Sequence, residues 1–185
     1  MKRLFLGFPL AEEIKDKIKP VLKQLKETSA DLNLVDAENL HFTVKFLGEA
    51  EEDKIVGIIE RVEKISTAQV SFSVNLEKVG AFPSLENITV LWVGIRSTDL
   101  IDFMEKVNLL LEDIRKEEHK EVLPHLTLGR MKSAKNKEKV QKWIGEHKDM
   151  TVGTMKVENM YLYESKLTPQ GPRYSIVKEF KFKAN

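Results

Sequence analysis

The spacing of apolar residues predicts short strands interleaved with four helices. Apolar residues recur every three or four positions around residues 14–25, 55–65, 100–117 and 140–144, which indicates helices. We expect Pro20 to kink or split the first of them. Alternating or continuous apolar runs predict strands at 3–8, 33–35, 40–47, 70–79, 88–95, 123–128, 152–163 and 174–182, with a loop at 80–84 and a turn at 168–172.

The order of these elements points to a fold class. It runs strand, helix, strands, helix, strands, and then the same pattern again. Single helices between paired strands favour an α+β fold with largely antiparallel sheets over a doubly wound parallel sheet. No linker rich in Pro, Gly or Ser divides the chain, so residues 1–185 are predicted to form one domain. The doubled pattern predicts two similar lobes.

Composition narrows the class of protein. With 42% hydrophobic and 32% charged residues, the chain is typical of a folded, soluble protein. A net charge of +1 argues against wrapping a nucleic-acid duplex, so any RNA contact must come from a local patch. There is no cysteine, which excludes disulfides, thiolate ligands and thiol nucleophiles. The opening apolar run is too short for an export signal or a membrane span, so we expect a cytoplasmic protein.

One short pattern occurs twice, once in each half of the chain. Residues 41–44 read His-Phe-Thr-Val and residues 125–128 read His-Leu-Thr-Leu, both within predicted strands. Strand alternation places the His and the Thr of each copy on one face and the apolar residues on the other. A single His-x-Thr is common, and a lone histidine in a strand is more often structural. Two of only four histidines in the same context indicate a paired functional site.

Such a pair suits phosphodiester cleavage. Displacement at phosphorus needs a base on the entering oxygen and an acid on the leaving oxygen, and histidines titrate near neutrality. Threonine hydroxyls can hold the non-bridging oxygens. A catalytic metal normally takes three protein ligands, and neither strand offers a convincing third. We therefore expect no metal and no other cofactor, with His41, Thr43, His125 and Thr127 as the reacting and phosphate-holding groups.

Several segments resemble one known family. Residues 38–48, Glu-Asn-Leu-His-Phe-Thr-Val-Lys-Phe-Leu-Gly, and 124–130, Pro-His-Leu-Thr-Leu-Gly-Arg, are similar to its two signatures. Residues 3–7, 80–83, 91–94, 162–167 and 171–174 look like its opening, central and closing segments. This family is the RNA 2′,3′-cyclic phosphodiesterases, also called 2′-5′ RNA ligases, of the two-histidine phosphoesterase superfamily. The likeness covers nearly the whole chain.

The resemblance implies two lobes around a central cleft and hydrolysis of an RNA 2′,3′-cyclic phosphate to a 2′-phosphomonoester. In some members it also implies reversible 2′-5′ joining of RNA ends. By analogy His41 is the proton donor to the departing 3′-oxygen and His125 the acceptor that activates water, while Thr43 and Thr127 bind the phosphate. On the sequence alone the two histidine roles are interchangeable. The expected partner is RNA with a cyclic phosphate end, such as a tRNA fragment, with no membrane and no obligate protein partner.

Four further residues are candidates for binding the substrate. Arg130 lies five positions after His125, where it can contact a phosphate, although most arginines form surface ion pairs. Lys45 continues the alternation of the first motif and is expected on its polar face. Phe82 and Tyr163 can stack on a base, with core packing as the alternative use of either ring.

Two rival functions remain open at this point. One is a module that binds RNA ends or nucleotides without turnover, although a pure binder need not keep both proton-transfer groups. The other is the same chemistry on a small nucleotide, which the sequence separates poorly from RNA.

Overall fold

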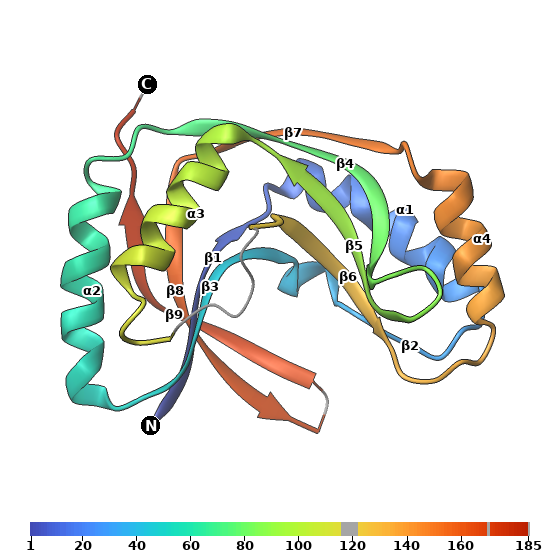
Figure 1. The fold of residues 1–185 in the computed structure, drawn as a ribbon, viewed down its shortest axis with the longest axis horizontal. Coiled ribbons are helices and arrows are strands. Elements are labelled where there is room, and N and C mark those ends of the chain that lie inside the picture. The colour runs from blue at the N-terminus through green and yellow to red at the C-terminus, as the bar shows by residue number, and fades with distance from the viewer. Residues whose placement is uncertain (116–121, 170, 185) are drawn as a thin grey trace.

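A computed structural model describes residues 1–115, 122–169 and 171–184 (Figure 1). Its helices are α1 (Glu12–Glu27), α2 (Glu52–Ser66), α3 (Thr98–Leu110) and α4 (Lys137–His147), with a 3-10 turn η1 (Ala37–Asn39). Its strands are β1 (Lys2–Pro9), β2 (Leu32–Leu34), β3 (His41–Ala50), β4 (Phe72–Pro83), β5 (Ile88–Arg96), β6 (His125–Met131), β7 (Thr151–Val157), β8 (Asn159–Thr168) and β9 (Gly171–Lys181).

All the named strands join one sheet through antiparallel pairs, which confirms the predicted α+β class. The strand order is β7-β4-β5-β6-β3-β1-β8-β9, and β2 pairs with the outer part of β6. Apart from β2, the sheet thus has two halves of four strands each, and their inner strands β6 and β3 each carry one His-x-Thr. Figure 1 shows α2 and α3 beside the half that contains β3, and α1 and α4 beside the half that contains β6.

The helices form where the sequence pattern gives each of them an apolar stripe. In α1 the buried residues are Ile14, Ile18, Val21 and Leu25, spaced for one face of a helix. The start of α3 is set by Ser97, whose hydroxyl accepts a hydrogen bond of 3.3 Å from the backbone N–H of Leu100. No helix in the described ranges is both long and apolar enough to cross a membrane.

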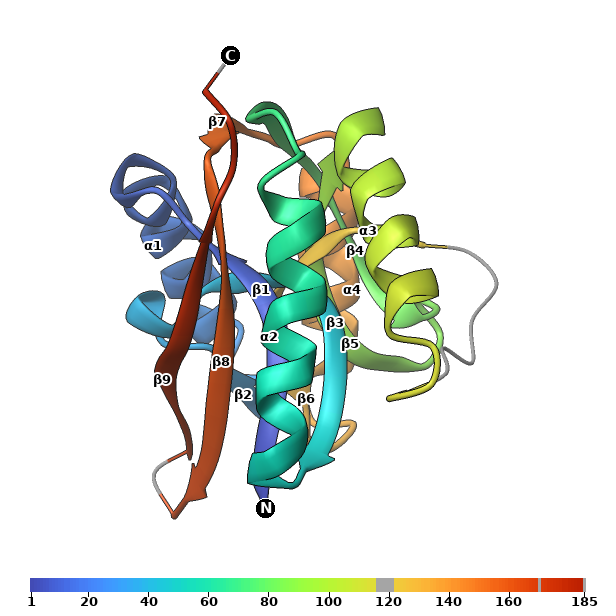
Figure 2. The same ribbon diagram turned by 90° about the vertical axis from the view of Figure 1, so that its left-hand side faces the viewer.

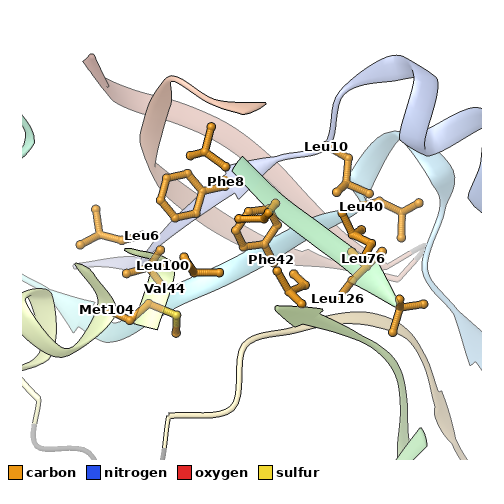
Figure 3. Packing of buried hydrophobic residues seen from close by; sticks show 14 of the residues in the cluster. Leu6, Phe8, Leu10, Leu40, Phe42, Val44, Leu76, Leu100, Met104 and Leu126 are labelled. Carbon is orange, nitrogen blue, oxygen red and sulfur yellow. The ribbon is translucent and has the colours of Figure 1, made fainter. Parts of the chain in front are cut away.

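The core lies between the helices and the apolar face of the sheet. Fully burying each large apolar side chain stabilises the fold by roughly 1.5–3 kcal/mol. Figure 3 shows strand residues meeting helix residues there: Leu6 and Phe8 of β1, Phe42 and Val44 of β3, Leu76 of β4 and Leu126 of β6, with Leu100 and Met104 of α3. Both x residues between the His and Thr of the motifs therefore belong to this core.

The structure corrects four expectations. Residues 80–84 do not form a loop throughout, because β4 continues to Pro83 and pairs with β5. Gly80 marks a close approach, since a Cβ there would lie 2.3 Å from the Trp92 ring. Residues 152–163 form two strands, β7 on β4 and β8 on β1. Helix α1 continues through Pro20, so the split offered as one of two effects of that proline does not occur. Helix α3 ends at Leu110, and residues 116–117 of the predicted helix lie outside the described residues.

Candidate active site

The two His-x-Thr strands meet at a narrow seam. The pair that joins β3 to β6 is Phe42 with Leu126, and both side chains are buried in the core. Their sequence neighbours must then point to the opposite face of the sheet. Continuing the antiparallel register by one residue in each direction sets His41 across from Thr127 and Thr43 across from His125. The fold thus brings the four predicted residues onto one face, with each histidine across from the threonine of the other motif.

Both imidazoles are held by the backbone in the same way. His41 Nδ1 lies 2.7 Å from the carbonyl oxygen of Asn39, and His125 Nδ1 lies 2.8 Å from that of Leu123. A carbonyl oxygen can only accept a hydrogen bond, so Nδ1 carries the hydrogen in each ring. Nε2 is therefore the nitrogen left for chemistry, as an acceptor when the ring is neutral and a donor when it is protonated.

The surroundings of the two imidazoles favour their neutral forms. Burial lowers the pKa of His41 below its usual value, and the hydrogen bond to Asn39 opposes the change. Burial likewise lowers the pKa of His125, against the hydrogen bond to Leu123, and the nearby charge of Arg130 lowers it further. Of the two histidines, only His125 has a positively charged neighbour that lowers its pKa.

Each imidazole also contacts an aromatic ring edge to face. The ring of Tyr174 lies 5.0 Å from that of His41 at 80°, and the ring of Phe82 lies 5.0 Å from that of His125 at 81°. Phe82 was a predicted site residue, whereas Tyr174 was named only within a segment of family likeness. Its approach to His41 depends on the pairing of β9 with β8 and of β8 with β1, which no local pattern reveals.

Phe5 is the centre of an aromatic cluster on the histidine face of the sheet. Its side chain is 3% exposed, yet it lies outside the main core. The centre of its ring lies 4.8 Å from that of His41 and 5.2 Å from that of Tyr174. It stacks on Tyr163, with the ring centres 5.0 Å apart and the planes at 20°. Burial, followed by the neighbouring Tyr161, raises the pKa of Tyr163 to about 12, so its hydroxyl stays protonated. The predicted residue Tyr163 therefore lies next to the site, partly exposed and packed on Phe5.

A β-bulge removes Lys45 from this face. The β1–β3 register passes from Gly7 with Thr43 to Leu6 with Lys45, so Val44 is the extra residue. Lys45 therefore lies on the same face of the sheet as Leu6, the face that packs against the core, and is 1% exposed. Its ammonium group donates a hydrogen bond of 3.3 Å to Asn108 Oδ1. The expectation that Lys45 adds charge beside the first motif was wrong, because the bulge resets the alternation.

The second motif has a bulge at the equivalent place. Trp92 pairs with Thr127 and Leu91 with Gly129, so Leu128 is the extra residue. This reset brings Arg130 onto the face of His125, in agreement with its effect on the pKa of that histidine. Arg130 is exposed, and its guanidinium has no ion pair with any residue in the described ranges.

A shallow pocket of about 370 Å³ opens beside His125. Most of the residues that line it are apolar, and three of them, Glu77, Lys78 and Arg96, are charged. The lining consists of Glu77, Lys78, Phe82, Trp92, Gly94, Ile95, Arg96, Ile101, Val122, Leu123, Pro124 and His125. Within the described part of the chain, no three His, Asp or Glu side chains gather closely enough to hold a metal ion.

Comparison with known proteins identifies the family of this chain. The sequence model of the LigT-like phosphoesterases matches residues 8–92 and 96–174. A protein of Methanocaldococcus jannaschii called RNA 2′,3′-cyclic phosphodiesterase is 35% identical over 96% of this chain and 99% of its own. One of the same name from Archaeoglobus fulgidus is 34% identical, with coverages of 96% and 99%. The crystal structure of a Thermus thermophilus protein superposes with a TM-score of 0.84 at 23% identity, covering 98% of both chains. The chain belongs to the LigT-like phosphoesterase family.

Proposed function

We propose that this protein hydrolyses RNA 2′,3′-cyclic phosphate ends to 2′-phosphomonoesters by acid–base catalysis with two histidines and no metal. The observation that carries the proposal is the seam: two imidazoles with Nδ1 tied to carbonyl groups, on one face with two threonines. The name shared by the curated relatives supports RNA as the substrate class. We include tRNA fragments among the substrates to test.

In this mechanism water attacks the phosphorus and the bond to the 3′-oxygen breaks. His125 accepts the proton of the attacking water at Nε2, and protonated His41 donates a proton from Nε2 to the departing 3′-oxygen. The hydroxyls of Thr43 and Thr127 donate to the non-bridging oxygens as negative charge shifts onto them. Arg130 supports this assignment of roles, since a cation beside His125 favours the neutral form that a base requires. The products are a 2′-phosphate and a free 3′-hydroxyl.

The same arrangement of groups also suits the joining of two RNA ends. If a 5′-hydroxyl of another RNA attacks in place of water, the phosphorus becomes bonded to that oxygen and to the 2′-oxygen. The product is a 2′-5′ linkage, and the reverse reaction returns the cyclic phosphate. Ligation therefore needs no group beyond those used for hydrolysis.

The test is hydrolysis of an oligonucleotide with a 2′,3′-cyclic phosphate end in excess EDTA. We expect turnover to persist, with a 2′-phosphate identified by phosphorus NMR. His41→Ala and His125→Ala should each lower kcat by about 10²–10⁴-fold. Loss of activity in EDTA that a divalent ion restores would contradict the metal-free mechanism. Binding without turnover would instead identify a binding module, and turnover of mononucleotides alone would identify a small-nucleotide enzyme.

A further inference from the structure

Aromatic side chains continue across the histidine face beyond the reacting groups. Phe5 lies between Phe46 of β3, at 6.0 Å, and Tyr163 of β8, at 5.0 Å, and it also contacts Tyr174 of β9. The strands that carry these rings, β3, β1, β8 and β9, are consecutive in the sheet, as Figure 2 shows. The proposed acid–base mechanism uses none of these four rings.

Part of this aromatic surface is open to solvent. Phe46 is 48% exposed, and the bulge at Val44 is what brings it onto the histidine face. Ile176, which pairs with Tyr163 and so shares its face, is 60% exposed. An exposed aromatic ring and an exposed branched aliphatic side chain on one open sheet face form an apolar patch next to the site.

Two arginines lie beside the same surface. Arg3 is two residues before Phe5 on β1, and Arg130 is on the face of His125. Both are exposed, and both lie close enough to Tyr174 that their charges lower its pKa, against a larger opposite effect of burial. Glu49 pairs with Arg3 in the sheet without an ion pair, and in the described ranges neither guanidinium has an ion-pair partner. Flat rings with cations beside them suit unpaired nucleotides, which combine base faces with phosphates.

We propose that this aromatic surface binds the nucleotides on the 5′ side of the reacting end, with a base stacked on Phe46 and the connecting phosphates beside Arg3 and Arg130. The proposal rests on the proposed function and narrows its substrate to single-stranded RNA ends of more than one nucleotide. Stacking on a ring face is tolerant of sequence, because every base has such a face. The surface therefore selects for length and for an unpaired 3′ end rather than for a particular sequence.

The experiment compares kcat/KM for a mononucleotide 2′,3′-cyclic phosphate with that for a tetranucleotide carrying the same end. The wild-type protein should prefer the tetranucleotide. Phe46→Ala should lower the tetranucleotide-to-mononucleotide ratio by about 5- to 150-fold, the range measured for a stacked base. Phe46→Leu, which keeps an apolar contact with Phe5 but has no flat ring, should lower it too. Leu109→Ala, at an exposed site on α3, is the control and should leave the ratio unchanged.

Arg3 is tested through the salt dependence of the same reaction. Arg3→Ala should reduce the slope of log kcat/KM against log salt for the tetranucleotide by about 0.7, the value for one phosphate contact with a single strand. Arg173→Ala is the matched control, because Arg173 is exposed on β9 at the residue before Tyr174 and so points to the other face.

Two results would overturn the proposal. One is an unchanged tetranucleotide-to-mononucleotide ratio in both Phe46 variants, including the case in which both substrates lose activity equally. The other is a wild-type protein with no preference for the tetranucleotide. If the wild-type protein hydrolyses neither substrate, the proposed function fails instead. Fluorescence anisotropy with a labelled tetranucleotide that ends in a 2′-phosphate then tests the surface alone. Phe46→Ala should weaken that binding and Leu109→Ala should not, and equal binding by both variants would refute the surface.

Discussion

Leu126→Ala perturbs the seam without touching a reacting group. Leu126 is 0% exposed, lies between His125 and Thr127 in sequence, and pairs with Phe42 across the seam. Truncation leaves a cavity between the two halves of the sheet, which should lower the free energy of unfolding by about 2–5 kcal/mol. Ile18→Ala is the matched control, because Ile18 is also 0% exposed and lies in α1, which contributes no residue to the seam pair. Its loss of stability should fall in the same range.

The two variants should differ in catalysis. A displacement of about 1 Å between reacting groups costs on the order of 10²-fold in rate. We therefore expect Leu126→Ala to lower kcat for cyclic phosphate hydrolysis by about 10- to 100-fold, and Ile18→Ala to change it less than about twofold. Urea unfolding gives the stability of each variant, and kcat is measured where both are folded. Equal kcat values in two variants of similar stability would refute the idea that the seam sets the catalytic geometry.

The pH profile of kcat/KM should be a bell whose maximum lies below pH 6.5, because burial lowers the pKa of both histidines. Activity falls at low pH because the base His125 becomes protonated, and at high pH because the acid His41 loses its proton. Arg130→Gln should move the acidic limb to higher pH, and a limb that stays in place would contradict the influence of Arg130 on His125. Lys45→Ala should lower the free energy of unfolding by about 1.5–3 kcal/mol and leave KM unchanged, as urea unfolding and steady-state kinetics will show. A substrate with sulfur in place of the departing 3′-oxygen should rescue kcat of His41→Ala and not of His125→Ala; the reverse pattern would exchange the two roles.

Local pattern was enough to locate the main elements and the paired motifs. Buried x residues and partly exposed histidines follow from strand alternation, and the structure has both. Alternation alone could not place Lys45, because the bulge at Val44 is defined by pairing with β1, more than thirty residues earlier in the chain. The loop predicted at residues 80–84 was wrong for a similar reason. Its glycine and proline are typical of a loop, whereas the glycine makes room for the Trp92 ring on the next strand.

Tyr174 could not be identified from the sequence as a neighbour of His41 for a different reason. Its position near His41 requires β8 to pair with β1 and β9 to pair with β8, so three strands from the two ends of the chain must assemble first. No periodicity within residues 171–181 carries that information. A residue of this kind can be found only once the strand order is known, whereas the histidines could be found from a motif repeated within one chain.

The chemical difference between the two halves lies outside the repeated motif. Both histidines have the same backbone hydrogen bond, and both strands have a bulge at the residue that follows the threonine of the motif. Five residues after His41 the chain has Phe46, and five residues after His125 it has Arg130. The cation therefore acts on one imidazole, favouring its neutral form, while the aromatic surface extends from the other. In the proposed mechanism a symmetric backbone supplies two proton-transfer groups, and the asymmetric neighbours assign the base to His125 and the direction of the RNA chain to the side of His41.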